Sequence, residues 1–201
     1  MLLALPGMAA TLKLQITDQA GKPLPDAVAT LTADAPDAAP GKPAAPKEHF
    51  VDQKDETFVP LVEVVTVGET VLFRNSDKTR HHVYTFSPLS PFDFVLKPNE
   101  VSQPIRPQKP GVIPVGCNIH DFMIQYLFVT DARWAGKTDA QGSLQLADLP
   151  NGTYTVKLWH PRLRPGASVP TQTVTVTGDQ ATASLRMAVM APPRDDDHDH
   201  Y

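Results

Sequence analysis

Three metal-binding side chains, Cys117, His120 and Met123, lie within seven residues of one another, and they constrain the fold more than any other feature of the chain. Thiolate, imidazole and thioether are soft or borderline donors, and together they suit copper better than magnesium or calcium. A copper centre with one thiolate and one weak thioether also needs a second imidazole. Because this loop holds a single histidine, the fold has to bring another histidine against it from a distant segment.

Two adjacent histidines, His81 and His82, supply that donor from a segment that reads as a β-strand. Neighbouring residues of a strand point to opposite faces, so only one of the pair can reach the same ion. Each donor taken singly has a plainer explanation, since a free cysteine is usually a small buried apolar residue and a methionine usually fills a core. Taken together, and with strands on both sides of the cysteine loop, the donors favour a metal site.

The spacing Cys-x2-His-x2-Met after a β-run is similar to the metal loop of the cupredoxins, and its shortness resembles the amicyanin type. The upstream apolar strand, Asn75, a polar loop and then a histidine resemble the first-ligand strand of the same family. The resemblance implies one type 1 copper ion held by four ligands, which are His81, Cys117, His120 and Met123. It places His82 at the following position, where small cupredoxins usually carry asparagine.

Polar residues near these donors are candidates for orienting them. A ligating histidine usually donates its other ring N–H to an oxygen acceptor. Asn75, Asn118 and Asp121 are the polar side chains nearest in sequence, and His82 lies beside the ligand on the same strand. We therefore expect support for the ligands from among these four residues.

The rest of the chain indicates an all-β fold. Leu12, Leu14 and Ile16 alternate with polar residues, which is the period of a half-buried strand, and turn residues separate this run from a second strand ending at Leu31. Residues 62–67 and 70–73 resemble the two arms of a hairpin around Gly68 and Glu69. Prolines break residues 87–110, so any strands there are short or lie at a sheet edge.

Two domains are expected, one inserted into the other. Turn motifs near both ends, such as Leu149-Pro150-Asn151-Gly152-Thr153-Tyr154, resemble a carboxypeptidase regulatory-like sandwich of the immunoglobulin or transthyretin type. We predict that this sandwich comprises residues 11–47 and 132–190 and that a cupredoxin Greek-key β-sandwich, residues 48–131, is inserted into it. Two consecutive partial domains are the alternative, but each would have few strands to bury a sheet face. The wider pattern resembles cupredoxin-like methylamine utilisation proteins.

Composition and the chain ends narrow the class of protein. A formal charge of −4 argues against nucleic-acid binding, and no apolar run reaches the length of a membrane span. Residues 1–10 resemble the remnant of a signal peptide, although a frayed end fits them equally. Residues 33–47 are rich in alanine and proline and read as a linker, and residues 191–201 read as a disordered acidic and histidine-rich tail.

The leading hypothesis is an exported, periplasmic one-electron carrier that docks to a redox partner protein. A periplasmic copper carrier or chaperone would use the same donors, with a more open site and reversible Cu(I) binding. An adhesion or assembly module in which the metal only stabilises the fold is a third possibility. An enzyme is the least favoured hypothesis, because the sequence has no further histidine-rich copper motif, nucleophile elbow or phosphate loop.

Overall fold

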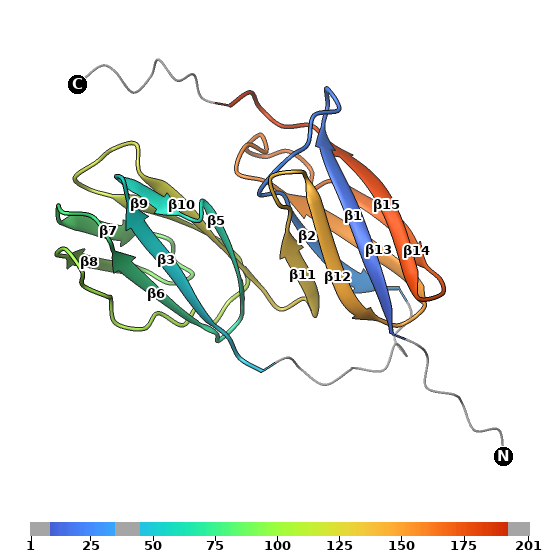
Figure 1. Cartoon of the computed structure of the whole chain (residues 1–201), viewed down its shortest axis with the longest axis horizontal. Helices are drawn as coiled ribbons and strands as arrows, with labels where there is room; N and C mark the ends of the chain where they lie inside the picture. Colours follow the sequence, from blue (N-terminus) through green and yellow to red (C-terminus); the bar gives the residue numbers. More distant parts are fainter. Residues whose placement is uncertain (1–8, 35–44, 193–201) are drawn as a thin grey trace. The chain divides into compact units, whose positions relative to one another are not determined.

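The computed structural model describes residues 9–34 and 45–192, and in this part of the chain every regular element is a strand (Figure 1). The predicted all-β fold class is therefore confirmed. None of the described segments forms a helix able to cross a membrane. The expectations for residues 1–8, for residues 35–44 of the linker and for residues 193–201 of the tail lie outside the described residues.

The described residues divide into two compact units. The split unit consists of residues 9–34 and 132–192, and the central unit consists of residues 45–131, between them in sequence. Residues 45–47, which the sequence pattern placed with the flanking segment, belong to the central unit. The reason is that the Lys47 N–H donates to Glu69 Oε1 at 3.0 Å, while the Lys47 carbonyl accepts the Thr70 N–H at 3.4 Å.

The split unit has a three-stranded sheet in the order β12-β1-β15 and a four-stranded sheet in the order β11-β2-β13-β14. A single apolar core contains residues from both sheets, so the unit is a β-sandwich. Leu12, Leu14 and Ile16 are fully buried, as their alternation predicts. The strands are β1 (Ala10–Asp18), β2 (Val28–Ala33), β11 (Trp134–Lys137), β12 (Ser143–Leu149), β13 (Gly152–Trp159), β14 (Thr171–Val176) and β15 (Gln180–Met187).

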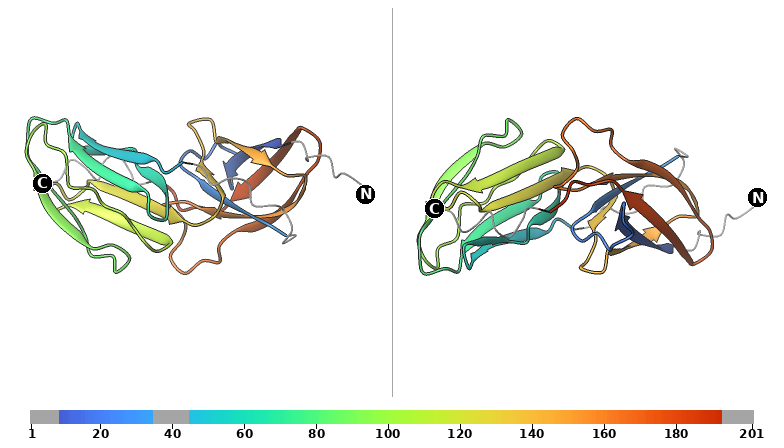
Figure 2. Two further views of the ribbon diagram at one scale, coloured as in Figure 1. Left: turned by 90° about the horizontal axis from the view of Figure 1, so that it is seen from below. Right: turned by 90° about the horizontal axis from the view of Figure 1, so that it is seen from above.

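The central unit has a five-stranded sheet in the order β5-β10-β9-β7-β8 and a three-stranded sheet in the order β4-β3-β6. Figure 2 shows β3 and β6, in cyan and green, in a different layer from the yellow-green β9 and β10. The strands are β3 (Glu48–Lys54), β4 (Thr57–Val59), β5 (Val62–Thr66), β6 (Thr70–Asn75), β7 (His81–Thr85), β8 (Phe92–Leu96), β9 (Gly111–Cys117) and β10 (Ile124–Thr130).

Aromatic side chains join the two layers of the central unit. Phe73 of β6 is fully buried, and its ring centroid lies 6.2 Å from that of Phe58, 5.5 Å from that of Phe92 and 5.8 Å from that of Phe94. Phe92 and Phe94 belong to β8, the edge strand of the five-stranded sheet, which is where a strand in the proline-rich segment was expected. This packing gives a rigid frame for the loops at one end of the sandwich.

The predicted hairpin of residues 62–67 and 70–73 is wrong. Both segments are strands, but β5 pairs in parallel with β10, whereas β6 pairs in parallel with β3 in the other sheet. The turn at Gly68 and Glu69 therefore carries the chain from one layer to the other. The alternation of apolar residues marks a strand and its buried face, and it is the same whichever sheet accepts the strand.

Candidate metal centre

Cys117 is the last residue of β9, and it is 3% exposed. The loop that follows is closed by its own backbone. The Cys117 N–H donates to the Met123 carbonyl at 3.3 Å, and the Met123 N–H donates to the His120 carbonyl at 3.0 Å. Because β9 pairs with β10 directly beyond this loop, both ends are fixed by a strand ladder. The sequence thus folds locally into a short turn that presents three potential ligands.

His81 reaches the loop because of the register of β7. Val83 of β7 lies opposite Cys117 of β9, and residues opposite each other in an antiparallel pair share a face. His81 precedes Val83 by two positions, so it lies on that face too. Both His81 and Val83 are fully buried. Strand register alone therefore aims this histidine at the thiol.

The three strongest donors converge. Nδ1 of His81 lies 3.7 Å from Cys117 Sγ, and Nδ1 of His120 lies 3.7 Å from the same sulfur. One donor atom from each of the three residues lies within 4.8 Å of the others. Metal–nitrogen bonds of about 2.1 Å and metal–sulfur bonds of about 2.3 Å, at tetrahedral to trigonal angles, separate the two donors by about 3.6–3.8 Å. The spacing fits ligands around a single ion.

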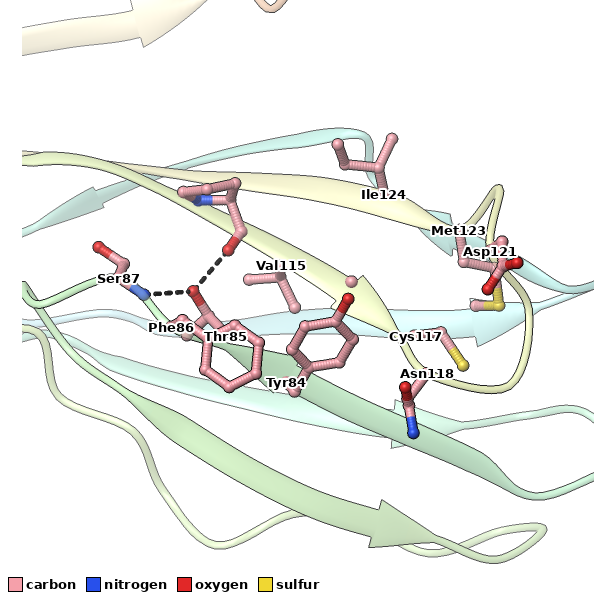
Figure 3. A pocket seen from close by; sticks show the side chains of 12 residues that line it. Tyr84, Thr85, Phe86, Ser87, Val115, Cys117, Asn118, Asp121, Met123 and Ile124 are labelled. Carbon is pink, nitrogen blue, oxygen red and sulfur yellow. Dashed lines mark hydrogen bonds between the residues drawn. The ribbon is translucent and has the colours of Figure 1, made fainter.

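Met123, the fourth donor predicted from the sequence, lies in the same loop as Cys117 and His120. It is 3% exposed and lines, with Cys117, a pocket of about 480 Å³ on the central unit. Figure 3 shows Cys117 and Met123 at one end of this pocket with Asp121 beside them, and Phe86 and Ser87 at the other end. A thiolate, two imidazoles and a thioether form the combination that suits copper.

Asp77, which the sequence analysis did not name, is the partner of the buried histidine. Its Oδ2 lies 2.8 Å from His81 Nε2. Burial raises the pKa of the Asp77 carboxyl, but hydrogen bonds from the Glu56 N–H, from His81 and from the Asp55 N–H outweigh burial and hold that pKa below its ordinary value of 3.8. The sequence feature that could have indicated this role is a carboxylate in a polar loop, four residues before a predicted ligand.

Asn75 supports the loop and not a ligand ring. Its side-chain NH2 donates to the carbonyls of Thr79, at 2.8 Å, and Leu96, at 3.0 Å, and its Oδ1 accepts the Asp77 N–H at 2.9 Å. The side chain is fully buried. Asn75, one of the candidates for orienting a ligand, thus does not contact the His81 ring; the ring's partner is Asp77, which Asn75 holds in place.

His82 and Asn118 lie outside the donor cluster. The His82 side chain is 25% exposed, and its Nε2 lies 2.7 Å from Asp93 Oδ1. Asn118 Nδ2 lies 3.3 Å from His82 Nδ1, and the Asn118 N–H donates to the His82 carbonyl at 2.9 Å. These contacts tie the start of the metal loop to β7, so both residues support the loop. Asp121 is exposed at the pocket rim.

The outer edge of His120 faces acidic and apolar groups. Its Nε2 lies 3.7 Å from Glu56 Oε1, and the His120 side chain is 16% exposed. The ring centroid of Phe122 lies 6.2 Å from that of His120. Ile119 and Phe122 are among the large apolar residues that remain exposed. His120 is therefore the most exposed of the four predicted donors, while His81 is enclosed.

Two further histidines have structural partners. His49 lies between Glu63, with Nδ1 to Oε1 at 2.7 Å, and Glu69, with Nε2 to Oε2 at 2.9 Å. His160, in the split unit, has its Nε2 3.1 Å from the Pro25 carbonyl, and its Nδ1 accepts the Arg162 N–H at 3.0 Å. Both ring nitrogens of each histidine thus have a protein group as hydrogen-bond partner.

No family model and no curated protein matches the chain. Among solved structures, a Cu-containing nitrite reductase from Thermus scotoductus is 28% identical, over 43% of this chain and 23% of that chain, with a TM-score of 0.38. A purple cupredoxin from Nitrosopumilus maritimus is 17% identical, over 41% and 99%, with a TM-score of 0.36. Amicyanin from Paracoccus versutus is 20% identical, over 50% and 98%, with a TM-score of 0.38.

The chain thus spans 23% of the nitrite reductase and almost the full length of the two smaller proteins. All three TM-scores lie below 0.5. The chemistry of the centre therefore rests on its own side chains and their spacing.

Proposed function

We propose that this chain is an exported type 1 copper protein that carries single electrons in a periplasmic redox chain. The proposal rests on the convergence of two imidazole Nδ1 atoms on one buried thiol, each at 3.7 Å. Met123, buried at the end of the same loop, supplies the weak axial thioether of such a centre. Copper held by this set would take up and release one electron between its Cu(I) and Cu(II) states.

Different residues of the site would serve the two needs of an electron carrier, a rigid donor set and a surface for docking. His81 and Cys117 are buried in strands, which limits rearrangement of the donors between oxidation states. His120 presents its outer edge near the exposed Phe122 and Ile119. We expect a redox partner protein to dock there, because weak redox encounters use small interfaces and a short path to the metal favours transfer.

A copper titration followed by optical and electron paramagnetic resonance spectra tests the proposal. We expect saturation at one Cu(II) per chain with an intense thiolate-to-copper band and a type 1 spectrum. Cys117→Ser should lose the band while both units stay folded, since the loop is fixed by strand pairing. Weak colour without a thiolate band in the unaltered protein would refute the type 1 assignment.

A copper carrier remains a second candidate because the pocket lined by Cys117 and Met123 is open to solvent. A carrier would release Cu(I) quickly through that opening to an acceptor. Stopped-flow transfer of Cu(I) to a coloured chelator separates the two functions. A carrier would release the ion in seconds at low chelator concentration, whereas an electron carrier should retain it.

The split unit is proposed to be the carboxypeptidase regulatory-like sandwich of the immunoglobulin or transthyretin type, and the whole chain to be of the methylamine utilisation protein type. The supporting features are the turn motifs at both ends of the sequence and the flanking of the central unit by two segments of one sandwich. Export is proposed because a redox-active thiolate is better kept outside the reducing cytosol. No catalytic residue is assigned.

A further inference from the structure

Three hydrogen-bond donors converge on the carboxylate of Asp77. The Asp55 N–H donates to Oδ1 at 2.6 Å, and the Glu56 N–H donates to Oδ2 at 3.0 Å. Nε2 of His81 lies 2.8 Å from the same Oδ2. The Asp77 side chain is only 11% exposed. An ionised carboxylate only accepts hydrogen bonds, so it satisfies all three neighbours at once.

The tautomer of His81 follows from this arrangement. Because the Asp77 oxygens are already acceptors for two backbone N–H groups, the ring nitrogen facing them has to carry a hydrogen. In a neutral imidazole the other nitrogen, Nδ1, then has a free lone pair. That nitrogen is the one that lies 3.7 Å from Cys117 Sγ. In the neutral ring the carboxylate therefore leaves Nδ1 as the nitrogen with the lone pair, and that nitrogen faces the thiol.

The donors come from a turn far away in sequence. β3 and β4 pair as a hairpin in which Lys54 lies opposite Thr57, so Asp55 and Glu56 are its two turn residues. Their φ angles are 53° and 52°, as a type I′ turn requires. Both N–H groups point at Asp77. The Asp77 N–H is also bound, to Asn75 Oδ1, so the carboxylate is fixed from both sides.

The chain contains a matched pair for comparison. His82, the neighbour of His81, has its Nε2 2.7 Å from Asp93 Oδ1. The Asp93 side chain is 64% exposed, and His82 lies outside the donor cluster. Two adjacent histidines thus each have a carboxylate on Nε2, but only one of them faces the thiol.

We propose that Asp77 is a positioning residue of the metal centre, which holds His81 in its Nε2–H tautomer with Nδ1 directed at Cys117 and whose negative charge favours the more highly charged state of a bound ion. The part of this inference that concerns a bound ion rests on the proposed function. A carboxylate behind a ligating histidine raises the basicity of the ring, and loss of such a partner typically weakens metal binding by about 10- to 100-fold.

The first experiment is nitrogen-15 NMR of the histidine rings in the copper-free protein at pH 7. We expect His81 to be in the Nε2–H tautomer in the unaltered protein. Asp77→Asn should remove this preference, because the NH2 group of the new side chain would face either a backbone N–H or the His81 ring N–H, and two donors cannot bond to each other. Asp93→Asn should alter His82 alone. His81 carrying its hydrogen on Nδ1 in the unaltered protein would overturn the proposal, and that measurement needs no variant to fold.

The second experiment uses Cu(II) itself as the probe. Relative to Asp93→Asn, Asp77→Asn should bind Cu(II) about 10- to 100-fold more weakly and have a higher reduction potential, because an anionic partner stabilises the oxidised ion. Equal affinity and potential in the two variants would overturn the role of Asp77 at the metal. If the unaltered protein gives no thiolate band, the proposed function fails instead, and the NMR result still decides whether Asp77 sets the tautomer.

Discussion

The two adjacent histidines show how strand geometry assigns different roles to identical residues. His81 is fully buried beside the thiol, whereas the His82 side chain is 25% exposed and paired with Asp93. His81→Ala should abolish the thiolate-to-copper band, because it removes one of two strong nitrogen donors. His82→Ala should leave the band in place with a small shift. Optical spectra of both variants decide the matter, and the reverse outcome would mean that β7 is shifted by one residue.

In the proposed copper centre, Met123 is expected to tune the reduction potential without holding the ion. A thioether is a weak, long axial ligand, and the axial ligand sets the potential of sites of this kind. Met123→Gln should therefore retain an intense thiolate band but lower the reduction potential, since an amide oxygen is a harder donor that favours Cu(II). Cyclic voltammetry measures the change. An unaltered potential would show that Met123 only fills the core.

The donors could be predicted from the sequence, but Asp77, the group that orients the His81 ring, could not. Cys117, His120 and Met123 share one loop, so their proximity is a matter of chain length alone. Asp77 is different, because the groups that fix it are the backbone N–H groups of Asp55 and Glu56, from a hairpin that pairs in the opposite sheet. Backbone donors have no sequence signature, so the role of Asp77 appears only once that hairpin is placed.

The β3–β4 hairpin turn has a left-handed backbone at two residues without glycine. The φ of Glu56 is 52°, a conformation that costs an ordinary side chain roughly 1–2 kcal/mol. Glu56→Gly should relieve this strain and stabilise the central unit by about 0.5–1 kcal/mol after the greater chain entropy of glycine is counted. The Glu56 N–H to Asp77 is kept. Urea unfolding monitored in the central unit measures the gain.

A matched control for that variant lies in the split unit. Asp148 also has a left-handed backbone, with φ 59°. Asp148→Gly should stabilise the split unit and leave the unfolding of the central unit unchanged. A loss of stability of more than 1 kcal/mol in Glu56→Gly would show that the carboxylate facing His120 contributes more than backbone strain costs.

Strand identity was also easier to predict than strand pairing. The alternation in residues 62–67 and 70–73 gave both β5 and β6, but the hairpin between them does not form. Glu69, in the connecting turn, is instead bonded through its carboxylate to Lys47, Thr66 and His49. These contacts hold the turn at the place where the chain enters the central unit. Pairing of β6 with β3 is a tertiary contact, and local periodicity does not contain it.

At the scale of the molecule, each unit has its own apolar core. We therefore expect a shortened chain of residues 45–131 to fold alone and bind Cu(II). The complementary chain, residues 9–34 joined by a short Gly/Ser linker to residues 132–190, should fold without binding copper. Circular dichroism and copper titration of both chains test this. An unfolded complement would indicate that the two units share a folding core.

The pKa values of two buried histidines, one in each unit, are shifted in opposite directions. Hydrogen bonding to the Glu63 carboxylate, aided by Glu69 and opposed by burial, raises the pKa of His49 above its ordinary 6.5. Burial, aided by the charge of Arg162 and opposed by the Pro25 carbonyl and Asp26, lowers the pKa of His160 to about 4. Folding therefore promotes protonation of His49 and opposes protonation of His160.

The stabilities of the two units should consequently depend on pH with opposite signs. Below pH 6.5 the stabilising contribution of His49 is fully present, and it is lost as the pH rises through the raised pKa of the folded state. The contribution of His160 is fully present above pH 6.5 and is lost as the pH falls toward 4, because the unfolded chain then binds a proton that the folded split unit refuses. Carboxylates titrate mostly below this range and thiols mostly above it, so the histidines dominate a series from about pH 5 to 8.

Calorimetry of the unaltered protein, His49→Gln and His160→Gln measures the effect as the change in slope of each transition with pH. His49→Gln should flatten the loss of central-unit stability at high pH, and His160→Gln the loss of split-unit stability at low pH. Slopes that neither substitution alters would mean that both rings have the same charge in the folded and the unfolded chain.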